Sequence, residues 1–283
     1  MLTKGVESHR RNGNRPSGLS SVTRVSWLHI RDEGPIRWLA FDRPEHKNAI
    51  PFDGWSELTA AFRQFESSGS RVLILRGEGV DFCAGADLDP SDRPEMPSVV
   101  DRHRRMRIVG EAATTLHRLT KPSIAAVDGV AAGAGMNLAL GCDLVICSDR
   151  ARFTEIFARR GLTLDFGGSW LLPRVVGLHR ARELALSGRI VDAAEAVSLG
   201  VAMEAVPPDR LYERAVEVAE SWLAGAPFAQ LMIKRALASS LQSGFADAVA
   251  AEGQAQAVTL GTEDAAEGMA AFTEKRDPEW KGR

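Results

Sequence analysis

Two glycine-rich segments of this 283-residue chain could do chemistry with their backbone groups. They read CAGAD at residues 83–87 and AGAGM at 132–136, and each follows an apolar run typical of a strand. Because glycine permits sharp turns, such junctions can leave amide groups without an acceptor. Two unpaired amides aimed at one point would stabilise an oxygen that becomes negative during a reaction. The simpler interpretation is that the glycines only permit tight turns.

Asp165 is the candidate proton-transfer group. It lies between Leu164 and Phe166, and a pair of glycines follows at 167–168. Apolar surroundings raise the pKa of a carboxyl group, which suits a base that must take a proton near neutral pH. The alternative role is the N-terminal cap of a helix that begins at the glycines.

Alternating strand and helix patterns must position these segments. Two apolar alternations, at 25–31 and 36–42, predict a hairpin. The other expected elements are a helix over 52–67, strand 71–77, helix 98–119, strand 123–129, helix 133–141, strand 143–149, helix 168–186, helix 192–200 and strand 201–206. Repeated strand–turn–helix units predict an α/β core.

Three regions follow from the changes in pattern along the chain. Residues 1–24 are basic and rich in serine and arginine, which predicts a disordered extension, although a mitochondrial transit peptide would have a similar composition. Residues 25–207 hold the core and the candidate site. Only helical periodicity is present over 209–275, which predicts that 208–283 form a separate helical subdomain or an oligomerisation element.

Composition narrows the function classes. The formal net charge is −2, which argues against a nucleic-acid or membrane surface as the partner. The longest apolar runs stay well short of a membrane-spanning segment of about 18 residues. Three cysteines suit a reducing compartment, so we expect a cytoplasmic protein without disulfides.

Several familiar motifs fail on inspection. The triplet Asp165-Phe166-Gly167 matches a kinase DFG, but no HRD loop precedes it. A dinucleotide fingerprint would need a third glycine where Leu138 stands. Neither the cysteine spacing nor the six histidines form a metal-binding pattern, so we expect no metal. A GxSxG nucleophile motif is also missing.

Four segments together resemble the crotonase family, the enoyl-CoA hydratase/isomerase superfamily. They are FDRPEHKNAI (41–50), DFCAGADL (81–88), AVDGVAAGAGMNLALGCDLVIC (126–147) and GLTLDFGGSWLLPRVVG (161–177), in the order of the family. The resemblance extends over about 25–283. It implies a crotonase-like β/β/α spiral core with an all-helical C-terminal subdomain that forms homotrimers or hexamers. It also implies an acyl-CoA thioester as substrate, with coenzyme A as part of that substrate and no other cofactor.

The resemblance assigns roles to backbone and side-chain groups. The amides of Ala86 and Ala134 would form the oxyanion hole for the thioester oxygen, although many relatives have glycine at the second position. Residues that would bind the acyl-CoA are His46, Asn48, Ala49, Ala84, Asp87, Leu88, Asp89 and Gly133. For His46, a solvated turn residue is the alternative.

The acid–base groups depart from those of the hydratases, which use two glutamates. Asn137 and Phe157 occupy the two corresponding positions, so both carboxylates are missing. The Asp165 arrangement instead resembles the phenylacetate-pathway ring-epoxide/oxepin-CoA isomerases and the dienoyl-CoA isomerases. Glu155, two residues before the usual second position, is a possible additional carboxylate, but Phe157 is expected to face the pocket in its place. A single base favours isomerisation, since one group can take and return the proton.

Two other functions stay open at this point. An ordinary enoyl-CoA hydratase, which adds water to a trans-2-enoyl-CoA, is the nearer alternative. A non-catalytic member that binds RNA or protein is the other, supported by the arginine-rich stretch at 101–107. That stretch also suits a solvated helix face or a lid over the CoA phosphates, and the near-neutral charge argues against RNA.

Overall fold

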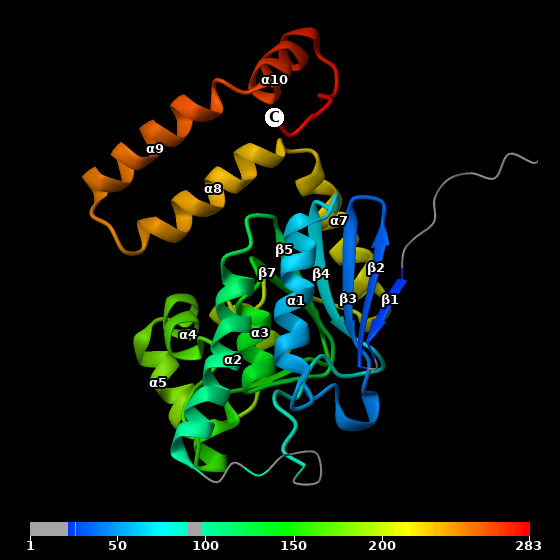
Figure 1. The fold of residues 1–283 in the computed structure, drawn as a ribbon, viewed down its shortest axis with the longest axis vertical. Coiled ribbons are helices and arrows are strands. Elements are labelled where there is room, and N and C mark those ends of the chain that lie inside the picture. The colour runs from blue at the N-terminus through cyan, green and yellow to red at the C-terminus, as the bar shows by residue number, and fades with distance from the viewer. Residues whose placement is uncertain (1–21, 26, 90–94, 96–97) are drawn as a thin grey trace, which may run out of the picture.

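The computed structural model describes residues 22–25, 27–89, 95 and 98–283 (Figure 1). The strands are β1 Val22–Val25, β2 Leu28–Glu33, β3 Ile36–Phe41, β4 Val72–Gly77, β5 Ser123–Val127, β6 Val130–Ala132, β7 Leu144–Ser148, β8 Arg152–Thr154, β9 Val191–Asp192 and β10 Glu204–Val206. The α-helices are α1 Gly54–Ser67, α2 Val99–His117, α3 Ala134–Leu140, α4 Gly168–Val176, α5 Leu178–Ser187, α6 Ala193–Leu199, α7 Leu211–Leu223, α8 Pro227–Ser240, α9 Phe245–Thr259 and α10 Glu263–Glu274. Short 3-10 helices include η1 Pro44–His46, η3 Ile156–Arg160 and η4 Pro208–Arg210.

A seven-stranded sheet forms the centre of the core, in the order β1-β2-β3-β4-β5-β7-β10. The first three strands are antiparallel, and β3, β4, β5, β7 and β10 run parallel. A second sheet has the order β6-β8-β9. The α/β core expected from the sequence is therefore confirmed.

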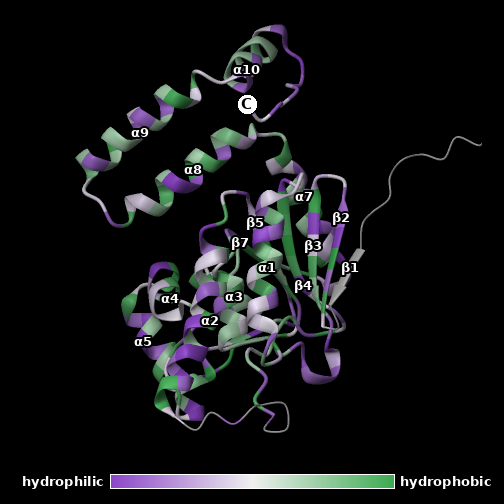
Figure 2. Cartoon of the chain, viewed as in Figure 1, coloured by the Kyte–Doolittle hydropathy of each residue, from purple (hydrophilic) through white to green (hydrophobic). Residues whose placement is uncertain are grey.

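Helices cover both faces of the seven-stranded sheet, and most residues of its central strands are apolar (Figure 2). On β4, Leu73 and Leu75 face the cluster under α1, α2 and α3, whereas Ile74 faces the cluster under α7. Such two-sided burial explains why the β4 sequence does not alternate between polar and apolar residues. Because both faces are closed, the chemistry must lie where the parallel strands end.

The detailed elements follow the sequence with three exceptions. The helix expected over 168–186 is two helices, because Gly177 between α4 and α5 has a φ of +76° and interrupts the helical path. Strand β1 begins at Val22, inside the segment predicted as an extension; residues 1–21 lie outside the described residues. The short strands β6, β8 and β9 were not predicted, since two or three residues carry too little periodicity to be recognised.

Two helices of the C-terminal part lie apart from the sheet, as Figure 1 shows for α8 and α9. They pack on each other, and none of their described side chains is buried. In contrast, α7 buries Leu211, Ala215, Val218 and Ala219 against the sheet. The all-helical character predicted for 209–275 is confirmed, but α7 belongs to the core by its packing.

Gly135→Ala tests how closely the backbone packs at the start of α3. A Cβ at this position would lie 2.0 Å from the carbonyl oxygen of Cys83, so we expect a loss of about 1–3 kcal/mol in the free energy of unfolding. Gly110→Ala is the control, because its Cβ would meet open space on the exposed side of α2. There the change should stabilise the helix by about 0.5–1 kcal/mol. Urea denaturation checks both variants, and equal effects would contradict the packing argument.

Candidate functional site

The two glycine-rich loops meet at the carboxyl ends of neighbouring parallel strands, β4 and β5. Backbone hydrogen bonds join them directly: the Cys83 amide donates to the Val130 carbonyl at 2.9 Å, and the Ala132 amide donates to the Cys83 carbonyl at 3.0 Å. On its other side the first loop pairs with Ile50, whose amide donates to the Gly85 carbonyl at 2.8 Å. The segment 41–50 and both loops are thus joined by backbone hydrogen bonds into one unit.

The amides predicted for an oxyanion hole lie on adjacent loops. A Cβ on Gly85, which has a φ of +91°, would lie 3.3 Å from the Ala134 nitrogen and 2.7 Å from the Ala132 carbonyl oxygen. Glycine is therefore required for this approach. Among the described residues, no backbone oxygen accepts a hydrogen bond from the amide of Ala86 or of Ala134, the first residue of α3. Both amides are thus left without a backbone acceptor on neighbouring loops, and their joint contact with one substrate oxygen stays a prediction.

The predicted CoA-binding residues divide into supporting and exposed groups. The side chain of Asn48 is buried and fully engaged, donating to the carbonyls of Glu78 and Asp81 and accepting from the Arg43 amide. Asp87 accepts from the Arg43 guanidinium at 2.8 Å, which ties segment 41–50 to the first loop. Both side chains therefore hold segment 41–50 and the first loop in place, and their contact with a CoA group stays a prediction.

The other predicted CoA contacts differ in their exposure to solvent. His46, Leu88 and Asp89 are exposed. Ala49 is buried and offers its carbonyl to Arg43, while the Ala84 amide donates to the Lys47 carbonyl at 2.9 Å. For His46, the exposed position on η1 is compatible with ligand contact and with a solvated turn alike.

Three polar residues from three segments of the chain, Asn137, Glu155 and Asp165, lie next to the start of α3. Asn137, in α3, donates from Nδ2 to the backbone carbonyl of Asp165 at 3.0 Å and to Glu155 Oε2 at 3.4 Å. The Asn137 side chain is packed on Gly168, where an added Cβ would lie 2.4 Å from Nδ2. Oδ1 of Asn137, Oε1 of Glu155 and Oδ1 of Asp165 are buried without a hydrogen-bond partner among the described residues. We refer to these three side chains as the carboxyl cluster.

Burial dominates the electrostatics of the carboxyl cluster. It raises the pKa of Glu155 to about 8, helped by the charge of Asp165 and opposed by the Asn137 hydrogen bond. Burial likewise raises the pKa of Asp165 to about 6. Desolvation penalises the charged form of a carboxyl group, and Glu155, with 1% of its surface exposed, is affected more. Burial thus raises the pKa of both carboxyl groups, and it raises that of Glu155 further.

The structure decides two questions about these residues. Asp165 does not cap α4 with its side chain; the N-cap is Gly167, and only the Asp165 carbonyl accepts from Gly168. Phe157 is buried, its ring close to Gly133, while Glu155 turns toward Asn137. The turn into η3 after the short strand β8 sets the direction of Glu155, and the role of Glu155 as an additional carboxylate stays a prediction.

Other kinds of site have no counterpart in the part of the chain that the structure describes. It contains no group of three histidine, cysteine or acidic side chains that could hold a metal ion. The three cysteines are free and buried, and burial raises the pKa of the Cys83 thiol to about 12. Of the helices in the described ranges, none has the length and apolar character needed to cross a membrane.

Comparison with protein-family models matches residues 32–283 to the family described as enoyl-CoA hydratase/isomerase. The chain belongs to this family. It is 35% identical to the 1,2-epoxyphenylacetyl-CoA isomerase of Escherichia coli K12, over 89% of this chain and 97% of that protein. It is also 35% identical to the short-chain-enoyl-CoA hydratase of Clostridium acetobutylicum, over 87% and 94% of the two chains.

Solved structures give the same fold. The enoyl-CoA hydratase of Bacillus anthracis superposes with a TM-score of 0.86 at 30% sequence identity, covering 91% of this chain and all of that one. The crotonase-like fold predicted from the sequence is thereby confirmed. Relatives named as isomerases and as hydratases are similar to this family member to the same degree, so its reaction must be argued from its own residues.

Glu155→Gln tests the burial of the carboxyl cluster through stability. In the unfolded chain this carboxyl loses its proton near its ordinary pKa of 4.5, whereas in the fold it holds the proton to about pH 8. Because the folded state then binds more protons, stability falls as the pH rises between these values, by up to about 1.4 kcal/mol per pH unit. Gln removes this dependence.

We therefore expect the melting temperature of Glu155→Gln to exceed that of the parent protein by a larger margin at pH 8 than at pH 5. Thermal unfolding at one fixed protein concentration measures this difference. Glu220→Gln, on the exposed side of α7, is the matched control and should show no such trend. A margin for Glu155→Gln that is constant with pH would mean that Glu155 is ionised in the fold.

Proposed function

We propose that this protein is an acyl-CoA isomerase of fatty-acid or aromatic acyl-CoA breakdown, with Asp165 as its base. One observation carries the proposal: Oδ1 of the half-buried Asp165 is enclosed with no hydrogen-bond partner among the described residues, and the Asp165 backbone carbonyl accepts from Asn137, three residues after Ala134 in α3. Coenzyme A enters as part of the substrate, and no separate cofactor is invoked. Free, buried cysteines support a cytoplasmic location.

The proposed reaction passes through an enolate of the thioester. Asp165 takes a proton from the α- or γ-carbon, and the electron pair of the broken C–H bond moves onto the thioester oxygen. Amides of Ala86 and Ala134 hold that oxygen, and such donors are typically worth about 3–4 kcal/mol each. The proton then returns from Asp165 to another carbon, so that the double bond has moved and the base is restored. A pKa of about 6 leaves Asp165 ionised and still basic near neutral pH.

Hydration is the second candidate, and the structure gives a specific reason to keep it. Water addition normally uses two carboxyl groups, one for the water and one for the proton. Asn137 donates hydrogen bonds both to Glu155 and to the backbone of Asp165, so the site holds two carboxyl groups. Neither stands at the positions of the two hydratase glutamates, which Asn137 and Phe157 occupy. The hydratase named among the relatives also favours this candidate.

Asp165→Asn tests the assignment of the base. Removing a positioned general base should lower turnover at least about 100-fold. Acyl-CoA binding should stay within a few-fold, because the amide keeps the shape of the carboxyl. Turnover is measured with 3-enoyl-CoA substrates and 1,2-epoxyphenylacetyl-CoA in deuterated water, where the product should carry deuterium at an α- or γ-carbon. Crotonyl-CoA hydration should be slow compared with this exchange.

Two results would overturn the proposal. If crotonyl-CoA hydration is faster than exchange, the hydratase alternative is correct. If Glu155→Gln silences the protein while Asp165→Asn leaves turnover intact, the base is Glu155. Thermal shift with each CoA thioester shows in every variant that the fold and the ligand site are retained.

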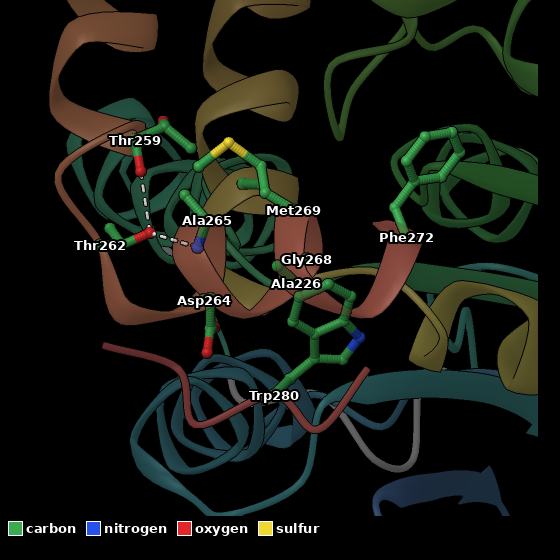
Figure 3. A pocket seen from close by; sticks show the side chains of 10 residues that line it. Ala226, Thr259, Thr262, Asp264, Ala265, Gly268, Met269, Phe272 and Trp280 are labelled. Carbon is green, nitrogen blue, oxygen red and sulfur yellow. Dashed lines mark hydrogen bonds between the residues drawn. The ribbon is translucent and has the colours of Figure 1, made fainter. Parts of the chain in front are cut away.

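The C-terminal helices support a further part of the proposal, a homotrimer or hexamer. On α8, Ile233 and Leu237 are exposed, as is Leu241 directly after it, at a spacing that places all three on one face. They border a groove of about 1050 Å³ between α8 and the ends of α2 and α3. A second apolar pocket, of about 390 Å³, lies beside Trp280 and the exposed Phe272 (Figure 3). Apolar surfaces of this kind mark protein interfaces, and we assign them to other copies of this chain.

Leu237→Glu tests the assembly. A charge on the exposed stripe of α8 would be desolvated in an interface, so we expect a shift from trimer or hexamer to monomer with unchanged helical content. Light scattering after gel filtration and circular dichroism measure the two properties. Ser240→Glu, at the exposed end of the same helix, introduces the same charge outside the groove and should leave the assembly intact. A monomeric parent protein would refute the proposal.

A further inference from the structure

The carboxyl cluster has too many acceptors. If both carboxyls were ionised, Oε1 of Glu155, Oδ1 of Asp165 and Oδ1 of Asn137 would be three buried acceptors with no donor among the described residues. The Asn137 amide is already used, since Nδ2 donates to the Asp165 carbonyl and to Glu155 Oε2. Buried polar atoms normally have partners, so a missing donor needs an explanation. A proton on one carboxyl converts an acceptor into a donor.

Burial decides which carboxyl carries that proton. Glu155 is 1% exposed, whereas Asp165 is only partly buried and can keep contact with solvent or substrate. Resting on the proposed function, we infer that Glu155 is a positioning residue that remains protonated while Asp165 acts as the base, so that the cluster carries one negative charge. Asn137 joins the two, since it bonds to the backbone of the base and to the neutral acid.

The single charge matters for the enolate. When Asp165 takes the proton, the negative charge moves from the carboxylate to the thioester oxygen held by the loop amides. A neutral Glu155 leaves this transfer electrostatically balanced. An ionised Glu155 would add a second, poorly solvated negative charge beside the developing enolate and would raise the barrier. Turnover therefore requires Glu155 in its neutral form.

Charged groups on the neighbouring elements do not offset this charge. The charge of Asp165 raises the pKa of Glu155 further and so opposes its ionisation. The nearby cations have other partners: Arg159 of η3 donates to the Ser187 carbonyl, and Arg189, after α5, pairs with Glu183 and Glu195. The segment 186–189 contributes backbone to this region, where a Cβ on Gly188 would lie 3.3 Å from the Glu155 carbonyl oxygen. In the part of the chain that the structure describes, no cation is thus placed to keep Glu155 ionised.

The test is the pH profile of kcat/KM for the full-length protein, with the isomerised thioester as the readout. The parent protein should show activity that rises through about pH 6, as Asp165 ionises, and falls about tenfold per pH unit above about pH 8. In Glu155→Gln, the rise should remain and the fall should disappear, because the amide cannot ionise. Glu220→Gln, on the surface of α7, should keep both limbs.

A second measurement needs no turnover. The infrared band of a neutral carboxylic acid should be present at pH 7 in the parent protein, be lost in Glu155→Gln and persist in Asp165→Asn. The inference is overturned if the fall in activity above about pH 8 survives in Glu155→Gln. It is also overturned if the carboxylic-acid band is equally strong in the parent protein and in Glu155→Gln. A fully active Asp165→Asn would instead refute the proposed base, while the infrared result still decides the protonation of Glu155.

Discussion

The contact between two backbone loops is the constraint on which the rest of the site depends. Cys83 exchanges hydrogen bonds with β6, the strand that leads into α3. Glycine at 85 and 135 lets the two loops approach each other without side chains between them. Because both loops follow parallel strands in the centre of the sheet, the apolar layers on either face hold them in register. The amides of Ala86 and Ala134 inherit their relative position from this scaffold.

The carboxyl cluster uses the same scaffold differently. Asn137 is fixed by its place in α3 and by the absence of a side chain at Gly168, so its amide presents donors at a defined place. Two carboxyls are brought to it from irregular segments, at a cost in desolvation that a purely structural arrangement would avoid. Stability given up at buried polar groups is a common feature of functional sites.

The C-terminal helices α8 and α9 contribute little to the core of a single chain. One face of the seven-stranded sheet is closed by α7, whereas α8 and α9 bury none of their described side chains and still carry exposed leucine, isoleucine and phenylalanine residues. A subdomain of this composition is stable when another surface covers it. The helices thus serve the proposed assembly more than the fold of a single chain.

Local pattern was enough to predict the alternation of strands and helices, the two glycine loops and the apolar surroundings of Asp165, because each depends on residues close together in the sequence. Tertiary structure decided the features that depend on the direction in which a side chain points. Glu155 joins Asp165 because a three-residue strand and the turn after it orient its side chain toward α3, and such short elements leave no periodic signal. The break at Gly177 was missed for the same reason: one residue with a positive φ does not alter the apolar spacing on either side. Hydrogen-bond partners across segments and the burial that separates two pKa values arise only when distant parts of the chain are packed together.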